Sequence, residues 1–340
     1  MPYSFYVGID VSKATLDAAL IDDRYREVVH HIQVSNDEEG IGQMYRWLNT
    51  HPGFEVAQSL FCMEATGLYC YPLLQFLHLH EAPTWVENAI QIKRSLGIQR
   101  GKNDKIDAKR IAQYASKNHD QVRLWQPRRE VVEQLRQLAA LRERLVETRK
   151  RLLTPVNEFR QYGNQAMAMM LEKSMSKSIH AIEKDIDGVE KKLKQIIDGD
   201  DDLKKIFNLV TSIVGIGFVT AINLIIHTNE FKMLTDVRKL ACYCGLAPFE
   251  YSSGSSIRGK RRVHPMANRK LKTNMHMCSL IAVQVDQGLK QYYQRKLNEG
   301  KNKMSVLNAV KNKLLARVLA VVKRGTPYEK NFLPKCFAMS

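Results

Sequence analysis

A short apolar run near the N-terminus ends in a single acid, and this run constrains the fold more than any other feature. Residues 6–13 read Tyr-Val-Gly-Ile-Asp-Val-Ser-Lys, so that Asp10 follows a segment typical of a buried β-strand. A carboxylate at the end of a buried strand is held rigidly, as a hard divalent cation requires of its ligands. Because one acid cannot hold a catalytic Mg²⁺, we expect other acids in comparable positions.

Three further acids meet that expectation. Glu64 follows the apolar run Leu-Phe-Cys-Met at residues 60–63, and Asp104 and Asp107 lie three residues apart in a helical pattern. A spacing of three places the last two on one face of a helix. Each acid alone reads as an ordinary surface residue. Two acids at strand ends and two on one helix face, all within one short domain, together predict a Mg²⁺ site.

Residues 1–127 predict an α/β domain of the ribonuclease H-like (RuvC-like) type. Three short strands are expected at 3–10, 15–21 and 27–34, followed by a helix at about 37–49, a strand at 56–63, a helix, a strand at 84–87 and a helix from about residue 89. A three-strand meander followed by alternating helices and strands is the order of that fold. The fold carries acids on its first and fourth strands and on a late helix, where this chain has its four.

Residues 128–202 predict a helical insert that begins after a boundary at residues 127–129, Pro-Arg-Arg. A first helix is expected from 130 to 153, with Pro155 interrupting it. A second segment has apolar residues spaced 3-4-3-4-3, which is the pattern of a coiled-coil seam. This seam favours self-association, with an intrachain helical pair as the alternative. Its members are Ile179, Ile182, Ile186, Val189, Leu193 and Ile196.

Residues 203–340 predict a mainly α-helical domain. Gly215 and Gly217 lie between two helical runs, which favours a helix-hairpin-helix-like motif whose backbone N–H groups bind phosphate, with a plain helical hairpin as the alternative. Two basic amphipathic helices are expected at about 266–286 and 303–323.

A serine-rich string precedes these helices. Residues 251–262 read Tyr-Ser-Ser-Gly-Ser-Ser-Ile-Arg-Gly-Lys-Arg-Arg. One interpretation is a flexible loop that only grips phosphate. The other is that one serine attacks a phosphodiester while the cations hold it. The cations expected to contact nucleic acid, here and elsewhere, are Lys102, Arg258, Lys260, Arg261, Arg262, Arg269 and Lys270.

The charge balance favours a polyanionic partner. The chain has 52 Lys and Arg against 35 Asp and Glu, a net charge of +17. Such an excess is typical of nucleic-acid-binding proteins, although charge alone does not separate DNA, RNA and an acidic membrane surface. No run is long enough to cross a bilayer, and the first residues do not form a signal peptide. The six cysteines lack a framework spacing, so we expect no zinc site and a reducing, cytoplasmic compartment.

Six motifs taken together resemble those of the IS110 family of bacterial insertion-sequence transposases, a group that includes the Piv-type invertases. The resemblance spans nearly the whole chain in the family's order, with a coiled coil between two domains. Residues 8–13, 63–67 and 103–108 are similar to its N-terminal DEDD, RuvC-like domain, and residues 215–217, 244–248 and 253–259 to its C-terminal transposase domain.

This resemblance implies a site-specific DNA recombinase that is guided by a structured non-coding bridge RNA pairing with target and donor DNA. It implies homodimers that pair into a homotetramer, in which the acids of one subunit complete a site with the serine of another. The implied bacterial protein is cytoplasmic and associated with the nucleoid. The implied ligands of one or two Mg²⁺ ions are Asp10, Glu64, Asp104 and Asp107.

The resemblance also implies a transient phosphoserine bond at Ser253, the serine that opens the family's Ser-Gly-Ser-Ser string. Two departures from the family pattern matter. Val214 stands where a proline is common, which affects the hairpin turn more than the chemistry. The neighbouring Ser252 means that the choice of Ser253 depends on alignment to the motif.

Two other functions are compatible with the same motifs. One is a RuvC-like, metal-dependent, junction-resolving nuclease, in which the four acids activate water and the serines only grip phosphate. The other is a non-catalytic nucleic-acid-binding protein descended from a transposase. The presence of all four acids argues against the second, because a binding module does not need them.

Overall fold

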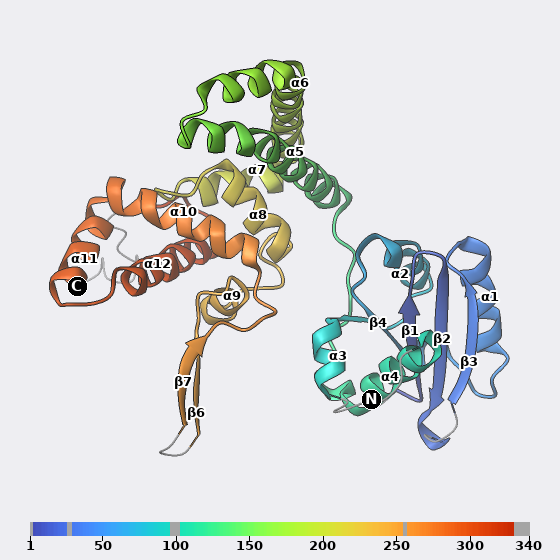
Figure 1. Ribbon diagram of the computed structural model, residues 1–340. Helices are drawn as coiled ribbons and strands as arrows, with labels where there is room; N and C mark the ends of the chain where they lie inside the picture. The colour runs from blue at the N-terminus through green and yellow to red at the C-terminus, as the bar shows by residue number, and fades with distance from the viewer. Residues whose placement is uncertain (1–2, 26–28, 96–102, 254–256, 330–340) are drawn as a thin grey trace, which may run out of the picture. The chain divides into compact units, whose positions relative to one another are not determined.

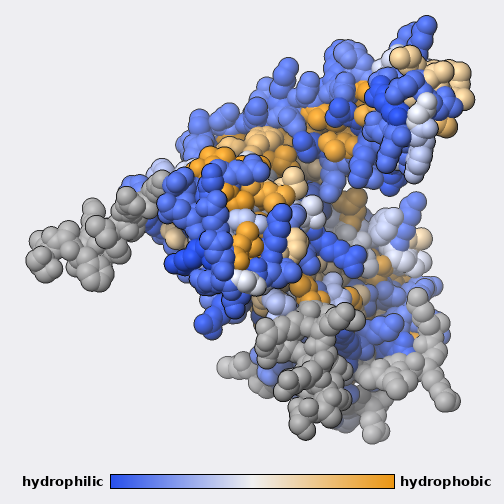
Figure 2. Space-filling model, turned by 60° about the vertical axis from the view of Figure 1, so that its left-hand side comes forward, coloured by the Kyte–Doolittle hydropathy of each residue, from blue (hydrophilic) through white to orange (hydrophobic). Residues whose placement is uncertain are grey.

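The computed structural model describes residues 3–25, 29–95, 103–253 and 257–329, and within 249–262 it describes the backbone alone (Figure 1). The chain divides into two compact units, Met1–Pro127 and Arg128–Ser340. In the described residues, no helix is both long and apolar enough to span a membrane. Hydrophilic residues cover most of the face in Figure 2, with hydrophobic ones gathered in a few patches.

The first unit is built on a five-stranded mixed sheet (Figure 1). Its strand order is β3-β2-β1-β4-β5; the first three strands are antiparallel, and β4 and β5 run parallel to β1. The predicted meander and the two later strands are confirmed, and the sheet is consistent with the ribonuclease H-like prediction. The strands are β1 (Phe5–Val11), β2 (Thr15–Asp22), β3 (Val29–Ser35), β4 (Ser59–Glu64) and β5 (Thr84–Glu87).

Helices cover both faces of this sheet. Alternate residues of a strand point to opposite faces, so β1 contributes Val7 and Ile9 to the core under α1 and α2, and Tyr6 to the core under α4. Residues of α1 and α2 line the first core, and buried alanines of α4 line the second. The helices of this unit are α1 (Glu38–Asn49), α2 (Tyr71–Leu79), α3 (Ala89–Ser95) and α4 (Asp104–Lys117).

The second unit begins with two long helices, α5 (Glu130–Gln161) and α6 (Gln165–Asp198), which fold back on each other. The prediction that Pro155 interrupts the first helix is wrong, because α5 continues through it. A proline inside a helix removes one backbone hydrogen bond, and tertiary packing can offset that loss. The next residue, Val156, is fully buried, and α5 packs along α6.

The predicted seam packs within the chain. Ile186, Val189 and Leu193 are buried, and the fourth buried position is Ile197 rather than Ile196. Ile179 and Ile182 lie further along α6 and are only partly buried. The structure therefore has the intrachain helical pair that the spacing left open, and self-association through the seam stays a prediction.

The rest of the second unit is a helical bundle with one β-hairpin (Figure 1). The two predicted basic helices are confirmed as α10 and α12, whereas α9, α11 and the hairpin were not predicted. The serine string is not an irregular loop, since part of it lies in the hairpin β6–β7. The elements are α7 (Asp201–Thr211), α8 (Phe218–Thr228), α9 (Val237–Tyr243), β6 (Phe249–Ser253), β7 (Ile257–Arg262), α10 (Arg269–Val285), α11 (Gln287–Asn298) and α12 (Lys303–Arg324).

The turn between α7 and α8 needs its first glycine. Gly215 has a φ of +96°, and a Cβ there would lie 2.8 Å from the carbonyl oxygen of Cys278 in α10. A side chain at this position would therefore be strained and would push α10 away. The short connection fits a helical hairpin, and phosphate binding by its backbone N–H groups stays a prediction.

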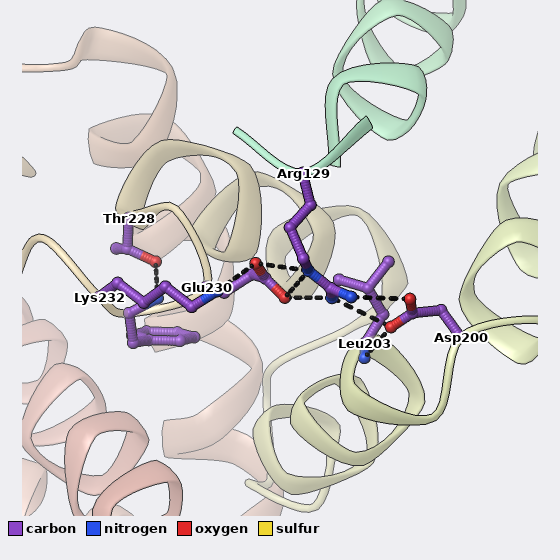
Figure 3. Close-up of polar contacts among 7 residues, drawn as sticks. Arg129, Asp200, Leu203, Thr228, Glu230 and Lys232 are labelled. Atoms are coloured by element: carbon purple, nitrogen blue, oxygen red, sulfur yellow. Dashed lines mark hydrogen bonds and ion pairs between the residues drawn. The ribbon is translucent and has the colours of Figure 1, made fainter. Parts of the chain in front are cut away.

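One arginine ties together three segments of the second unit (Figure 3). The guanidinium of Arg129, just before α5, donates to both carboxylate oxygens of Asp200, at 2.8 and 3.0 Å, and to the carboxylate of Glu230. Asp200 also caps α7 by accepting from the backbone N–H of Leu203. Burial raises the pKa of Glu230, but hydrogen bonds from Arg129 and Lys232 outweigh it and hold that pKa below its usual value.

We expect Arg129→Ala to lower the free energy of unfolding of the second unit by about 2–3 kcal/mol, because it leaves the buried Glu230 without its main partner. The matched control is Arg149→Ala in α5, since the side chains of Arg149 and of its ion-pair partner Glu183 are both more than 40% exposed. That change should cost less than about 1 kcal/mol. Denaturant unfolding of the full chain measures both, and equal losses would contradict the role of Arg129.

Candidate active site

The register of the strands places acids side by side across the sheet. Asp10 of β1 pairs with Asp17 of β2, and Glu64 of β4 pairs with Glu87 of β5. The parallel pairing of β1 with β4, continued by one residue, brings Asp10 level with Glu64. These four acids form a row on the face of the sheet that α4 covers. Cys62 and Trp85, two positions before Glu64 and Glu87, and Ala19, two positions after Asp17, line the core under α4, and Gly8, two positions before Asp10, contacts α4.

A glycine lets α4 lie directly on the central strand. A Cβ on Gly8 would lie 2.1 Å from the backbone nitrogen of Ala112 and 2.3 Å from the carbonyl oxygen of Ala108, far closer than atoms can approach. Both alanines are fully buried. Because Gly8 and Asp10 are two residues apart, they face the same side of the strand. The close contact therefore carries the first turn of α4 toward Asp10.

The start of α4 is fixed by a side-chain cap. Asn103 accepts from the backbone N–H of Ile106 at 2.8 Å, so that Asp104 and Asp107 fall in the first helical turn. Acids are favoured there by the positive end of the helix dipole. Asp107 also accepts from the Arg110 guanidinium at 2.9 Å. The two predicted helix acids therefore lie at the end of α4 that faces the row.

The acids act on one another electrostatically. The pKa of Asp10 is raised to about 6, first by burial and then by the negative charges of Asp107, Glu64, Asp104 and Asp17, in that order. Like charges disfavour the ionised form of a buried carboxyl group. The structure thus brings all four predicted acids into one region of negative potential, which a divalent cation would relieve.

The donor set suits Mg²⁺, which prefers carboxylate oxygens. Within the described part of the chain, however, no three acid, histidine or cysteine side chains are already arranged as a complete metal site. Asp107 is held by Arg110 instead. The residues therefore fit a hard cation by the chemistry of their donor atoms.

Two acids of the row were missed by sequence reasoning. Asp17 is only 2% exposed; it accepts from the amide of Gln33 at 2.9 Å and lies 2.8 Å from Nε2 of His31. Glu87 accepts from the Tyr114 hydroxyl at 3.2 Å. Asp17 lies within β2 and Glu87 ends β5, both at positions that face α4, and only the pairing between strands places them in the row. Because protein donors already bond to them, we expect them to support the row rather than to bind a cation.

The predicted serine lies at the end of a strand. Ser253 is the last residue of β6 and pairs with Ile257, while Ser252 pairs with Arg258. Lys260, Arg261 and Arg262 belong to the backbone of β7, and the side chains of all the hairpin residues lie outside the described part. Ser255, Ser256 and Lys102 are also outside it.

A backbone hydrogen bond closes the base of this hairpin. The backbone N–H of Asn268 donates to the carbonyl of Tyr243 at 2.7 Å, which ties the segments entering and leaving the hairpin together. The first turn of α10 carries the two remaining predicted cations. Arg269 is exposed, and Lys270 donates to Glu143 of α5 at 2.7 Å. Lys270 is thus engaged within the protein.

Two family models match this chain, one over its N-terminal part and one over its C-terminal part. Residues 7–159 match a family described as "Transposase" and named for the DEDD domain of IS110, and residues 207–294 match the "Transposase IS116/IS110/IS902 family". The chain belongs to the IS110 family of transposases. It is therefore an enzyme that recombines DNA.

Two of the relatives of this IS110-family transposase match nearly its whole length. It is 26% identical to the pilin gene-inverting proteins of Moraxella bovis and Moraxella lacunata over 332 residues, which cover 96% of this chain and 98% of each relative. It is 31% identical over 121 residues to the "Insertion element IS110 uncharacterized 43.6 kDa protein" of Streptomyces coelicolor, covering 36% of this chain and 30% of that protein.

We expect Gly8→Ala to abolish recombination and to lower the free energy of unfolding of the first unit by about 3 kcal/mol, because α4 must move off β1. The matched control is Gly42→Ala in α1 of the same unit, where the nearest atom to a new Cβ is an Arg46 side-chain nitrogen at 3.5 Å. It should be neutral or stabilising by up to about 1 kcal/mol. Thermal unfolding and recombination assays measure both variants. A Gly8→Ala protein as stable and as active as Gly42→Ala would contradict the close contact between β1 and α4.

Proposed function

We propose that this transposase is a site-specific DNA recombinase that cuts and rejoins strands through a phosphoserine intermediate and is guided by a structured RNA. The observation that supports metal-dependent chemistry is the crowding of Asp107, Glu64 and Asp104 around the half-buried Asp10. Four carboxylates so placed repel one another, and a fold keeps such a group where a cation occupies it.

In the proposed cutting step, Oγ of Ser253 attacks the scissile phosphorus. A phosphorus–Oγ bond forms and one phosphorus–oxygen ester bond breaks, so the leaving strand ends in a deoxyribose hydroxyl. The proton of the serine hydroxyl is lost, and the leaving oxygen gains one. The reverse reaction with a hydroxyl of another strand restores the phosphodiester, so that no external energy source is required.

The acids have a defined part in this chemistry. Asp10, Glu64, Asp104 and Asp107 would hold Mg²⁺, which when bound supplies positive charge to the transferring phosphoryl group and its leaving oxygen. Asp107 would exchange its bond to Arg110 for the cation, and the strand positions of Asp10 and Glu64 keep their carboxylates in place. The cations of β7 would hold the flanking phosphates.

Nucleic-acid partners follow from the charge and from the family. A net charge of +17 suits donor DNA, target DNA and a guide RNA together. The RNA guide and the assembly of dimers into a tetramer come from the resemblance to the family. In that assembly the serine of one subunit would meet the acids of another at a single phosphate.

We expect Ser253→Ala to abolish the covalent protein–DNA adduct and to reduce recombination by at least about a thousandfold, because the nucleophile is gone. DNA and RNA binding should not change. The matched control is the neighbouring Ser252→Ala, which should still form the adduct. Denaturing gels of the protein with its copurifying RNA and labelled DNA measure the adduct.

The same gels distinguish the proposed recombinase from a junction-resolving nuclease. A junction-resolving nuclease would release cut DNA without an adduct, and Ser253→Ala would still cut. An adduct formed by the Ser253→Ala protein would remove this serine from the mechanism.

We expect Asp10→Asn to abolish cutting and yet to raise the melting temperature of the Mg²⁺-free protein by a few degrees, because it removes one of several crowded negative charges. Mg²⁺ should raise the melting temperature of the unsubstituted protein but not that of the variant. The matched control is Asp120→Asn, an exposed acid of the same unit, which should respond to Mg²⁺ like the unsubstituted protein. An equal Mg²⁺ response in all three would refute the metal site.

A further inference from the structure

One lysine of the second unit has a buried side chain. Lys311 of α12 is 5% exposed, and no described carboxylate forms an ion pair with it. Burial and then the positive charge of Lys272 in α10 lower the pKa of Lys311. A buried cation beside a second cation destabilises a fold unless an anion compensates it.

A histidine next to this lysine also lacks a partner. His276 lies one turn after Lys272 on α10, and its Nδ1 atom is buried with no hydrogen-bond partner among the described residues. Burial and then the charge of Lys311 lower the pKa of His276. A buried ring nitrogen normally has a partner, so this one points to a missing ligand. We call Lys272, His276 and Lys311 the basal cation cluster.

The basal cation cluster lies where the chain enters the serine hairpin. Asn308, one turn before Lys311 on α12, donates to the carbonyl of Leu246 at 2.7 Å. Gly245 has a φ of +65°, and a Cβ on it would lie 3.4 Å from Cδ of Lys272. The segment around Gly245 and Leu246 leads directly into β6, which carries Ser253 (Figure 1).

We propose that the basal cation cluster binds a phosphate group of the DNA strand that the serine hairpin cuts. This inference rests on the proposed role of Ser253. A phosphate would be an anionic partner for Lys311 and Lys272, and its oxygens would accept a hydrogen bond from the ring of His276. An ion pair at a buried cation is less screened by salt than one at a solvated surface lysine.

The phosphate in question is not the reacting one. The strand β6 has five residues, so its far end lies roughly 15 Å from its start. A phosphate at the base of the hairpin is therefore several nucleotides from the one next to Ser253. Lys311 is thus a positioning residue that fixes the register of the strand.

The test uses Lys311→Met in the full-length protein, which keeps the length of the side chain and removes its charge. Fluorescence anisotropy with a labelled DNA duplex, over a series of salt concentrations, should show weaker binding. The slope of log affinity against log salt should fall in magnitude by about 0.9, as for the loss of one phosphate contact. The melting temperature should stay equal or rise, because a buried unpaired charge is gone.

Three comparisons make the result decisive. Lys311→Arg keeps the charge and should keep the slope. Lys313→Met, on the same helix, removes an exposed cation that lies over the ring of Tyr292, and it should change the slope less. An unchanged slope for Lys311→Met, or equal effects at positions 311 and 313, would overturn the proposal. Loss of affinity for RNA alone, with DNA binding intact, would also overturn it.

The covalent adduct at Ser253 separates this inference from the function on which it rests. At saturating DNA, Lys311→Met should still form the adduct, because its defect is in holding the strand. Absence of the adduct in the unsubstituted protein would remove the serine mechanism, whereas the salt slope would still report whether Lys311 contacts a phosphate.

Discussion

The contact between Gly8 and α4 is the constraint on which the candidate site depends. A strand position without a side chain and two alanines on the helix allow the two backbones to touch. Any larger residue would separate them, and the acids at the first turn of α4 would then move away from Asp10. The electrostatic cost of bringing these carboxylates together is therefore met by backbone packing, which is rigid and local.

In the second unit, the structure depends in a similar way on the hydrogen bonds of Arg129. It joins the residue before α5, the cap of α7 and the turn after α8. In that turn Asn229, Glu230 and Phe231 all have positive φ, between 48° and 61°, which is unfavourable for residues other than glycine. The bonds from Arg129 to Glu230 and the burial of Phe231 hold this backbone, so the surrounding interactions compensate for the strain.

The sequence predicted what local periodicity determines. The strands of the first unit, the basic helices and the grouping of Asp10, Glu64, Asp104 and Asp107 all follow from alternation, helical spacing and the family motifs. It missed Asp17 and Glu87, because they join the row only through pairing between strands. It missed the β6–β7 hairpin because serines and arginines there lack the apolar alternation of a strand, and it misjudged Pro155 because tertiary packing outweighs a local break.

The two units concentrate opposite charges, and this contrast connects the candidate site with the basal cation cluster. Acids gather around Asp10, whereas Lys272 and Lys311 lie near each other and form no ion pair with an acid whose side chain the structure describes. Each group is unfavourable within the protein alone, because Asp10 and Lys311 are partly withdrawn from water and lie near groups of the same charge. On the proposed function, the acids would be complementary to the positive charge of a catalytic cation and the basal cation cluster to the negative charge of a DNA phosphate. A group of like charges that is unfavourable without a ligand is stabilised when a ligand of the opposite charge binds, and this gain contributes to the affinity for that ligand.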